Sequence, residues 1–164
     1  MIPYNFPNRF EIRETDEGYS FETESGNTYY VTFLKYPTIT EFLHTEVYMM
    51  NIDRKDGFNH RNGGRNRVRN TILAIVGMFF NSHNNALITV CDIIDGKQES
   101  RKRLFSRWFR DFGETYLEKL DADCMIDDIR TYASIMFRKD APNKSELKNE
   151  FSVLSEINFY NSEL

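Results

Sequence analysis

The spacing of apolar residues changes along this chain from every second position to every third or fourth position. This change restricts the fold more than any other feature. Through the first third, apolar residues alternate with polar ones, as in Phe10 and Ile12 or Tyr29, Val31 and Phe33. A period of two residues is typical of strands with one buried face. The separators TDEG and SGN contain glycines that suit tight turns. The first third therefore predicts an antiparallel meander.

The period becomes helical in the middle of the chain. A strand predicted over 46–52 leads into a loop, and apolar residues then recur every three or four positions over 66–81, which predicts a helix. The apolar run over 86–94 predicts a buried strand. Beyond it we expect a second helix over 98–119 and a last strand over 131–139.

Aromatic side chains form a stripe along the second predicted helix. Amphipathic helices bury such faces, so we expect the stripe to lie in the core. In the tail that follows, apolar residues at helical spacing predict a terminal helix, with Asn143 and Glu146 as its N-terminal cap. The aromatic stripe consists of Phe105, Trp108, Phe109, Phe112 and Tyr116.

These elements predict one α+β domain of 164 residues. The antiparallel meander leads into a strand-helix-strand-helix-strand mixed sheet with helices packed on it. We expect a strand-rich part over 1–53, a basic helix-strand-helix core over 54–120, and the last strand and C-terminal helix over 121–164. No apolar stretch approaches the ~20 residues of a membrane span, and no signal sequence is recognised, so we expect a cytoplasmic protein without a membrane partner. The spacing of Cys91 and Cys124 predicts neither a disulfide nor a metal site.

Positive charge is concentrated in the middle of an acidic chain. Net charge is −6 over 1–53, +8 over 54–110 and −6 over 111–164, for a total of −4. Segregated positive charge attracts nucleic acid, nucleotides or phosphorylated cofactors. The alternative interpretation is that the basic centre pairs with the acidic flanks, within the fold or across a homodimer. The predicted basic surface consists of Arg67, Arg69, Arg103, Arg107 and Arg110.

A glycine pair precedes the first predicted helix. Free N–H groups at a helix start, together with the positive end of the helix dipole, bind anions, and glycine permits close approach of the backbone. We therefore expect a phosphorylated small molecule, such as coenzyme A, at Arg61, Gly63, Gly64, Arg65 and Asn66. The alternative interpretation is a loop whose glycines only turn the chain.

The stretch RNGGRN at 61–66 resembles the R/Q-x-x-G-x-G/A element of the GCN-related N-acetyltransferase (GNAT) superfamily, with Arg61 and Gly64 at matching positions and Asn66 in place of the last small residue. In that family a strand precedes the element, and a helix, a strand, a second helix and a strand follow it, as predicted here over 46–138. The resemblance implies an acyl-coenzyme A-dependent N-acyltransferase whose backbone amides hold the pyrophosphate. Its second helix often carries a tyrosine that protonates the leaving thiolate, and Phe105 stands at the closest position here.

A second resemblance concerns RVRNTI, ALITVCD and RKRLFSRWF, which are similar to an uncharacterised family of small bacterial proteins and imply no activity. No catalytic residue is assigned. Asp53, Asp92 and Asp95 lie at predicted strand ends where a general base could act, and His60 is the best placed of three histidines. The competing function is a non-enzymatic interaction module that binds nucleic acid or an acidic protein through the basic surface.

Overall fold

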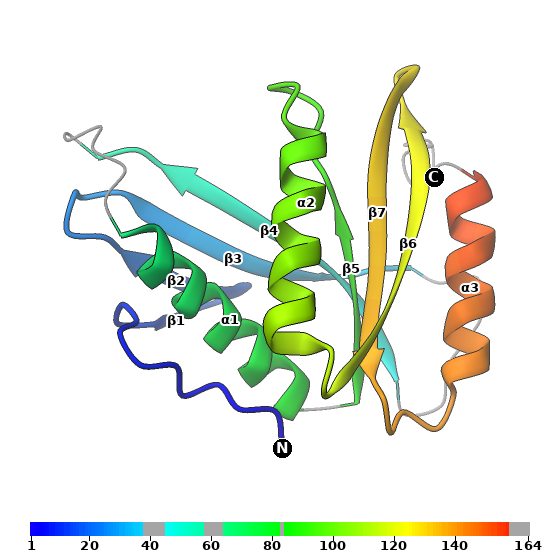
Figure 1. Ribbon diagram of the computed structural model, residues 1–164, viewed down its shortest axis with the longest axis horizontal. Helices are drawn as coiled ribbons and strands as arrows, with labels where there is room; N and C mark the ends of the chain where they lie inside the picture. Colours follow the sequence, from blue (N-terminus) through cyan, green and yellow to red (C-terminus); the bar gives the residue numbers. More distant parts are fainter. Residues whose placement is uncertain (38–44, 58–63, 83, 158–164) are drawn as a thin grey trace. The chain divides into compact units, whose positions relative to one another are not determined.

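The computed structural model places seven strands and three α-helices in the part of the chain that it describes (Figure 1). The predicted α+β fold, with a strand meander followed by alternating helices and strands and with helices packed on the strands, is confirmed. The described residues are 1–37, 45–57, 64–82 and 84–157.

Two compact units make up the chain. The first comprises Met1–Lys35 and Tyr48–His83, and the second comprises Tyr36–Val47 and Asn84–Leu164. Each unit has its own strands and helices. The single-domain organisation stays a prediction, because compact units of this kind occur both within one domain and as separate domains.

The first unit contains the predicted meander. Strands β1 (Arg13–Thr15), β2 (Gly18–Glu22), β3 (Thr28–Lys35) and β4 (Glu46–Lys55) pair antiparallel in this order. Helix α1 (Arg65–Ser82) follows and is one residue longer at each end than predicted. The alternation of apolar and polar residues thus correctly predicts strands, and the helical spacing of apolar residues correctly predicts α1.

Apolar side chains of α1 and the meander form the core of the first unit. Val31 lies opposite Tyr19 on β2 and Ile52 on β4, and it is fully buried. Phe79 of α1 stacks on Phe33 of β3 with ring centroids 4.4 Å apart. Aromatic pairs of this geometry add to the stabilisation that burial provides.

The N-terminal segment is attached to α1 by hydrogen bonds at both ends of the helix. The Ile2 N–H donates to the Asn81 side chain at 2.9 Å, and the Asn81 amide donates back to the Ile2 carbonyl at 2.7 Å. The Phe10 N–H donates to Oγ1 of Thr71 at 2.9 Å. The segment before β1 therefore packs along α1, and Phe10 lies buried near the start of this helix.

The second unit holds three strands, two helices and a short π-helix. The strands pair antiparallel in the order β5-β7-β6, so β7 is central. In chain order the elements are β5 (Asn85–Val90), α2 (Gln98–Trp108), η1 (Phe109–Gly113), β6 (Leu117–Ile126), β7 (Ile129–Arg138) and α3 (Lys144–Ile157).

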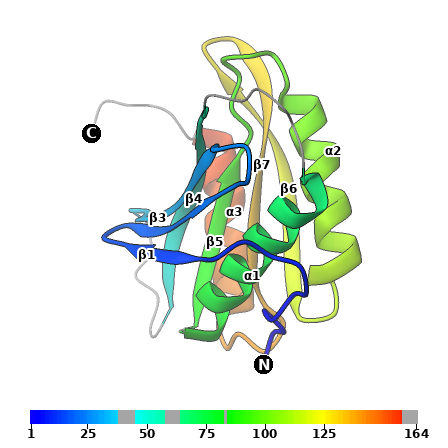
Figure 2. The ribbon, with the colours of Figure 1, turned by 90° about the vertical axis from the view of Figure 1, so that its left-hand side faces the viewer.

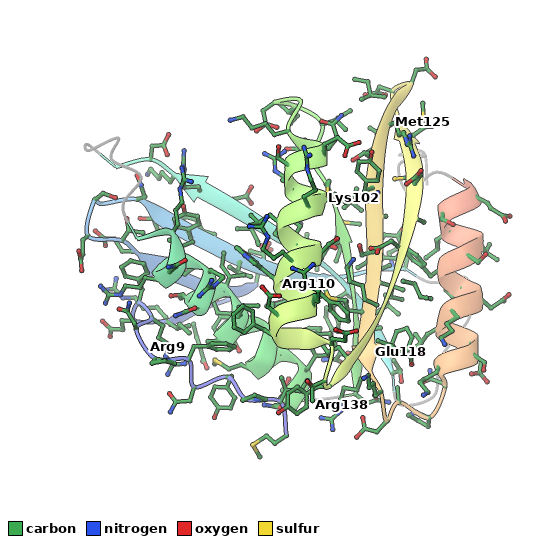
Figure 3. All side chains as sticks on the ribbon, viewed as in Figure 1. Arg9, Lys102, Arg110, Glu118, Met125 and Arg138 are labelled. Carbon is green, nitrogen blue, oxygen red and sulfur yellow. The ribbon has the colours of Figure 1, made fainter. Side chains whose placement is uncertain are left out.

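Helices α2 and α3 cover opposite faces of this small sheet (Figures 1 and 2). Glu118 of β6 accepts hydrogen bonds from α3, and Figure 3 shows it on the side toward that helix. Its neighbour Lys119 points to the other face, where Phe109 lies. Apolar side chains also lie between the sheet and α3, where Phe137 and Leu147 are fully buried. The predicted C-terminal helix is confirmed.

The prediction of a helix over 98–119 is wrong beyond Gly113, because β6 begins at Leu117. Strand β6 was not predicted. It joins β7 through a two-residue turn in which Asp127 has φ 48° and Asp128 φ 63°. Consecutive positive φ angles are typical of the tight hairpin turns that match strand twist. The strand predicted over 86–94 also ends early, at Val90.

The aromatic stripe of the second helix is not in the core, contrary to expectation. Helix α2 and η1 contain no buried residue. Phe105 and Trp108 are half-buried, and Tyr116 is 36% exposed. Phe109 of the stripe lies near a charged side chain of the sheet, with the Lys119 ammonium of β6 5.8 Å from the centre of its ring.

Candidate functional site

Gly64 occupies the position immediately before α1. Its φ is 81°, a left-handed conformation that glycine adopts without strain. Its carbonyl accepts the first helical hydrogen bond, from the Val68 N–H at 2.9 Å. Among the described residues, a Cβ on Gly64 would come nearest to the Phe10 ring at 3.7 Å and the Arg67 Cβ at 3.9 Å. Conformation, more than lack of space, therefore requires glycine here. Arg61 and Gly63, two further residues of the predicted site, lie outside the described residues.

The first turn of α1 is basic, which is the reverse of what a helix dipole favours. Arg65 and Asn66 begin the helix and are exposed, and the first turn contains no acidic residue. The positive end of the dipole is stabilised by negative charge and destabilised by cations. An anion bound at this end would offset both the dipole and the arginine charge.

Arg67 is held in place by three contacts within the first unit. Its guanidinium lies 4.2 Å from the centre of the Phe10 ring and donates to Glu24 at 2.6 Å and to the Arg9 carbonyl at 3.3 Å. Its Nε is buried and has no hydrogen-bond partner among the described residues. Arg67 is therefore held in a fixed position beside the start of α1, where its charge is paired with that of Glu24.

The predicted basic surface is divided between the two units. Arg69 donates to the Asn70 side chain at 3.1 and 3.2 Å, and Arg67 makes the contacts given above. Arg103, Arg107 and Arg110 lie in the second unit, on α2 and η1. A surface that joins the two groups of arginines stays a prediction.

Arg103 and Arg107 of α2 and Arg110 of η1 are exposed. Arg110 donates to Asp111 at 3.3 Å, a weak surface contact. Within the described part of the chain, neither Arg103 nor Arg107 has an ion pair or a side-chain hydrogen bond. Positive charge is therefore available on this helix.

Polar contacts join α2 to the sheet, an arrangement that the sequence analysis missed. The Tyr132 hydroxyl of β7 donates to the Glu99 carboxylate of α2, and this hydrogen bond raises the pKa of Tyr132. The Lys102 ammonium lies 3.8 Å from the centre of the Tyr132 ring, and Figure 3 shows Lys102 on α2. The Arg130 side chain, 5.7 Å from the same ring centre, pairs with Asp123. Strand pairing places Asp123 opposite Tyr132, and the packing of α2 on β7 adds Glu99 and Lys102.

A second group of polar side chains lies on the same face of the sheet, the one that α2 covers. Asp121 accepts from the Lys119 ammonium and from the Ser134 hydroxyl. Burial raises the pKa of Asp121, but these two hydrogen bonds outweigh it, so the net shift is downward. Burial also raises the pKa of the Cys91 thiol, although Arg101 and nearby lysines oppose the shift. Asp121 therefore has its hydrogen-bond partners on this same face of the sheet. Such a network of paired side chains stabilises the fold.

The three aspartates considered as general bases have other roles or positions. Asp92 accepts from the Ile94 N–H at 2.9 Å and shapes the turn after β5. Asp95 accepts two hydrogen bonds from Arg101, which lower the pKa of Asp95 to about 2. Asp53 lies inside β4, opposite Tyr30, and is exposed. All three histidines lie outside the described residues.

Among the described residues, no group of three or more histidine, cysteine, aspartate or glutamate side chains is arranged to hold a metal ion. No helix in the same residues is long and apolar enough to cross a membrane.

The chain belongs to the family of unknown function DUF6169. The profile of that family matches residues 64–153, more than half of the 164-residue chain. The matched region begins at Gly64 and ends within α3, so it includes α1, α2 and the whole β5-β7-β6 sheet. The predicted membership of an uncharacterised family is confirmed. No curated protein and no solved structure matches the chain.

Proposed function

We propose that this member of the family binds the pyrophosphate of an acyl-coenzyme A at the start of α1 and acts as a divergent N-acyltransferase. The observation that carries the proposal is the junction at Gly64. A glycine with φ 81° stands directly before an 18-residue helix whose first turn has arginine and no acidic residue. Backbone amides at such a junction donate to phosphate oxygens without interference from a side chain.

The charges around the junction favour a ligand with more than one phosphate group. Arg65 is exposed at the first helical position, and Arg67 is fixed beside it by Phe10 and Glu24. Guanidinium groups form charge-assisted hydrogen bonds with phosphate oxygens. The helix dipole adds to this attraction because both act at the same end of α1.

The order of elements also supports the proposal. Strand β4 precedes the junction, and α1, β5, α2 and further strands follow it, in the order that the resemblance to N-acetyltransferases implies. In the proposed reaction an amine attacks the thioester carbonyl, the C–S bond breaks, and the thiolate leaves. Phe105 has no proton to donate to this thiolate, so in this proposal the proton comes from solvent.

Calorimetric titration with acetyl-coenzyme A tests the binding step. We expect Arg65→Gln to weaken binding about tenfold, since a hydrogen bond to a charged group contributes about 1.5–3 kcal/mol. Arg13→Gln, which removes an exposed arginine from β1, is the matched control and should leave the affinity unchanged. Equal affinities in all three proteins, or no binding to the native chain, would contradict the proposal.

A second candidate function is an interaction module that binds polyanions through α2. It is favoured by Arg103 and Arg107, which are exposed and unpaired within the described residues. Salt-dependent retention on immobilised heparin tests it, with Arg103→Gln/Arg107→Gln expected to elute at lower salt than the native chain. Identical elution would refute it, because the remaining positive charge would then account for retention.

A further inference from the structure

Three arginines form a stripe along α2 and η1. Arg103, Arg107 and Arg110 are separated by four and three residues, so their side chains leave the helix on one side. With a rise of about 1.5 Å per residue, the stripe is about 10 Å long. All three side chains are exposed, and Figure 3 shows Arg110 on this helical segment. The stripe is therefore accessible to an extended anion.

Neighbours on the helix leave two of the three arginines, Arg103 and Arg107, without an ion pair among the described residues. Arg103 and Arg107 are one turn apart, an arrangement in which like charges destabilise a helix. Glu99, four residues before Arg103, accepts instead from Tyr132. Among the described residues, Asp111 is the carboxylate that contacts the stripe, and it pairs with Arg110. Guanidinium groups suit phosphate oxygens because their N–H donors form a planar fork.

A row of apolar side chains lies next to the arginine stripe. Leu104 is 39% exposed, and Trp108, one turn further, is half-buried. The Phe105 and Trp108 rings contact each other at an angle of 67°, with centroids 5.7 Å apart. Aromatic rings beside a basic groove or stripe are the combination on which successive bases of a single strand stack.

We propose that this side of α2 docks single-stranded nucleic acid, with phosphates on the arginine stripe and a base on Trp108; the inference rests on the second candidate function above. A single strand exposes both its phosphates and the faces of its bases. In a duplex the base faces are stacked on each other, so Trp108 would gain no contact. An acidic protein would satisfy the arginines but would present no base face to the indole.

Fluorescence anisotropy of a labelled 15-nucleotide oligothymidylate tests the docking. For three phosphate contacts, the logarithm of the association constant should fall with the logarithm of salt concentration at a slope of about −2. Arg103→Gln/Arg107→Gln should reduce the slope to about −0.7, because one contact remains. The control Arg13→Gln/Lys139→Gln removes two exposed charges elsewhere and should keep the native slope. Equal slopes in both variants would overturn the proposal.

Trp108 reports directly on base stacking, because it is the single tryptophan of the chain. Its fluorescence should be quenched by the oligonucleotide, and Trp108→Leu should weaken binding about fivefold or more with no change of slope. A duplex of equal length that binds as tightly, or poly-glutamate that displaces the strand at equal charge, would overturn the inference. Retention on heparin without oligonucleotide binding would overturn it while leaving the interaction module intact.

Discussion

Thr71 connects the N-terminal segment to the start of α1, and its removal should loosen the proposed coenzyme A site. The residue is fully buried. Its Oγ1 accepts from the Phe10 N–H at 2.9 Å and donates to the Arg67 carbonyl at 2.7 Å. Phe10 in turn supports the guanidinium of Arg67. A single hydroxyl thus holds the ring that positions one of the arginines beside Gly64.

Thr71→Val keeps the shape of the side chain and removes the hydroxyl. The Phe10 N–H would then be buried without a partner, which costs about 1–3 kcal/mol of the free energy of unfolding. Thr71→Ser keeps the hydroxyl and loses one methyl group, which costs about 0.8 kcal/mol. The two variants therefore separate the hydrogen bond from the packing.

Amide hydrogen exchange is the suitable assay, because it resolves the first unit from the second. We expect exchange at Phe10 to become faster by about tenfold or more in Thr71→Val, since each 1.4 kcal/mol changes an opening equilibrium tenfold. Thr71→Ser should change it much less. Equal exchange rates of the Phe10 amide in both variants would refute the reasoning. They would show that Thr71 stabilises this region through packing alone.

Three further predictions concern the two units separately. Gly18→Ala should destabilise the first unit by at least about 2 kcal/mol, because the new Cβ would lie 2.1 Å from the Val31 carbonyl oxygen. Urea denaturation measures this cost, and a value below about 0.5 kcal/mol would contradict the prediction. Asp128→Gly should stabilise the β6–β7 hairpin by a few tenths of a kcal/mol, because residue 128 has φ 63° and glycine adopts positive φ angles without strain. A lower midpoint of unfolding in this variant would count against the turn assignment. The pKa of Asp95 is lowered to about 2, so its contribution to stability should be present above about pH 3.8 and lost as pH falls toward 2. Carbon NMR should show this pKa rising toward its ordinary value in Arg101→Gln, and an unchanged pKa would contradict the pairing.

Much of the architecture follows from periodicity, and the failures have physical causes. The meander and α1 were predictable because alternation and a 3.6-residue period are local signals. Strand β6 was missed because its sequence LEKLDADCMI places charged residues on the α2 face, where Lys119 and Asp121 pair with each other. The turn at Asp127 and Asp128 was not recognised because it contains no glycine.

The candidate sites were predictable only in part. Gly64 and Arg65 could be placed at a helix start from the sequence, since glycine before a helical period is a local pattern. The contacts of Glu99, Lys102 and Tyr132 depend on how α2 lies on β7, which no local pattern encodes. The aromatic stripe was assigned to the core because its period is amphipathic, whereas neither α2 nor η1 contains a buried residue.

Amide NMR during titration with coenzyme A tests the central claim most directly. The account predicts that the largest chemical-shift changes occur at Gly64, Arg65 and Asn66, because their N–H groups lie at the proposed pyrophosphate position. Amides of α2 should change little. Saturable binding that shifts α2 or the β6–β7 hairpin and leaves the start of α1 unchanged would contradict the account, as would the absence of any change at millimolar coenzyme A.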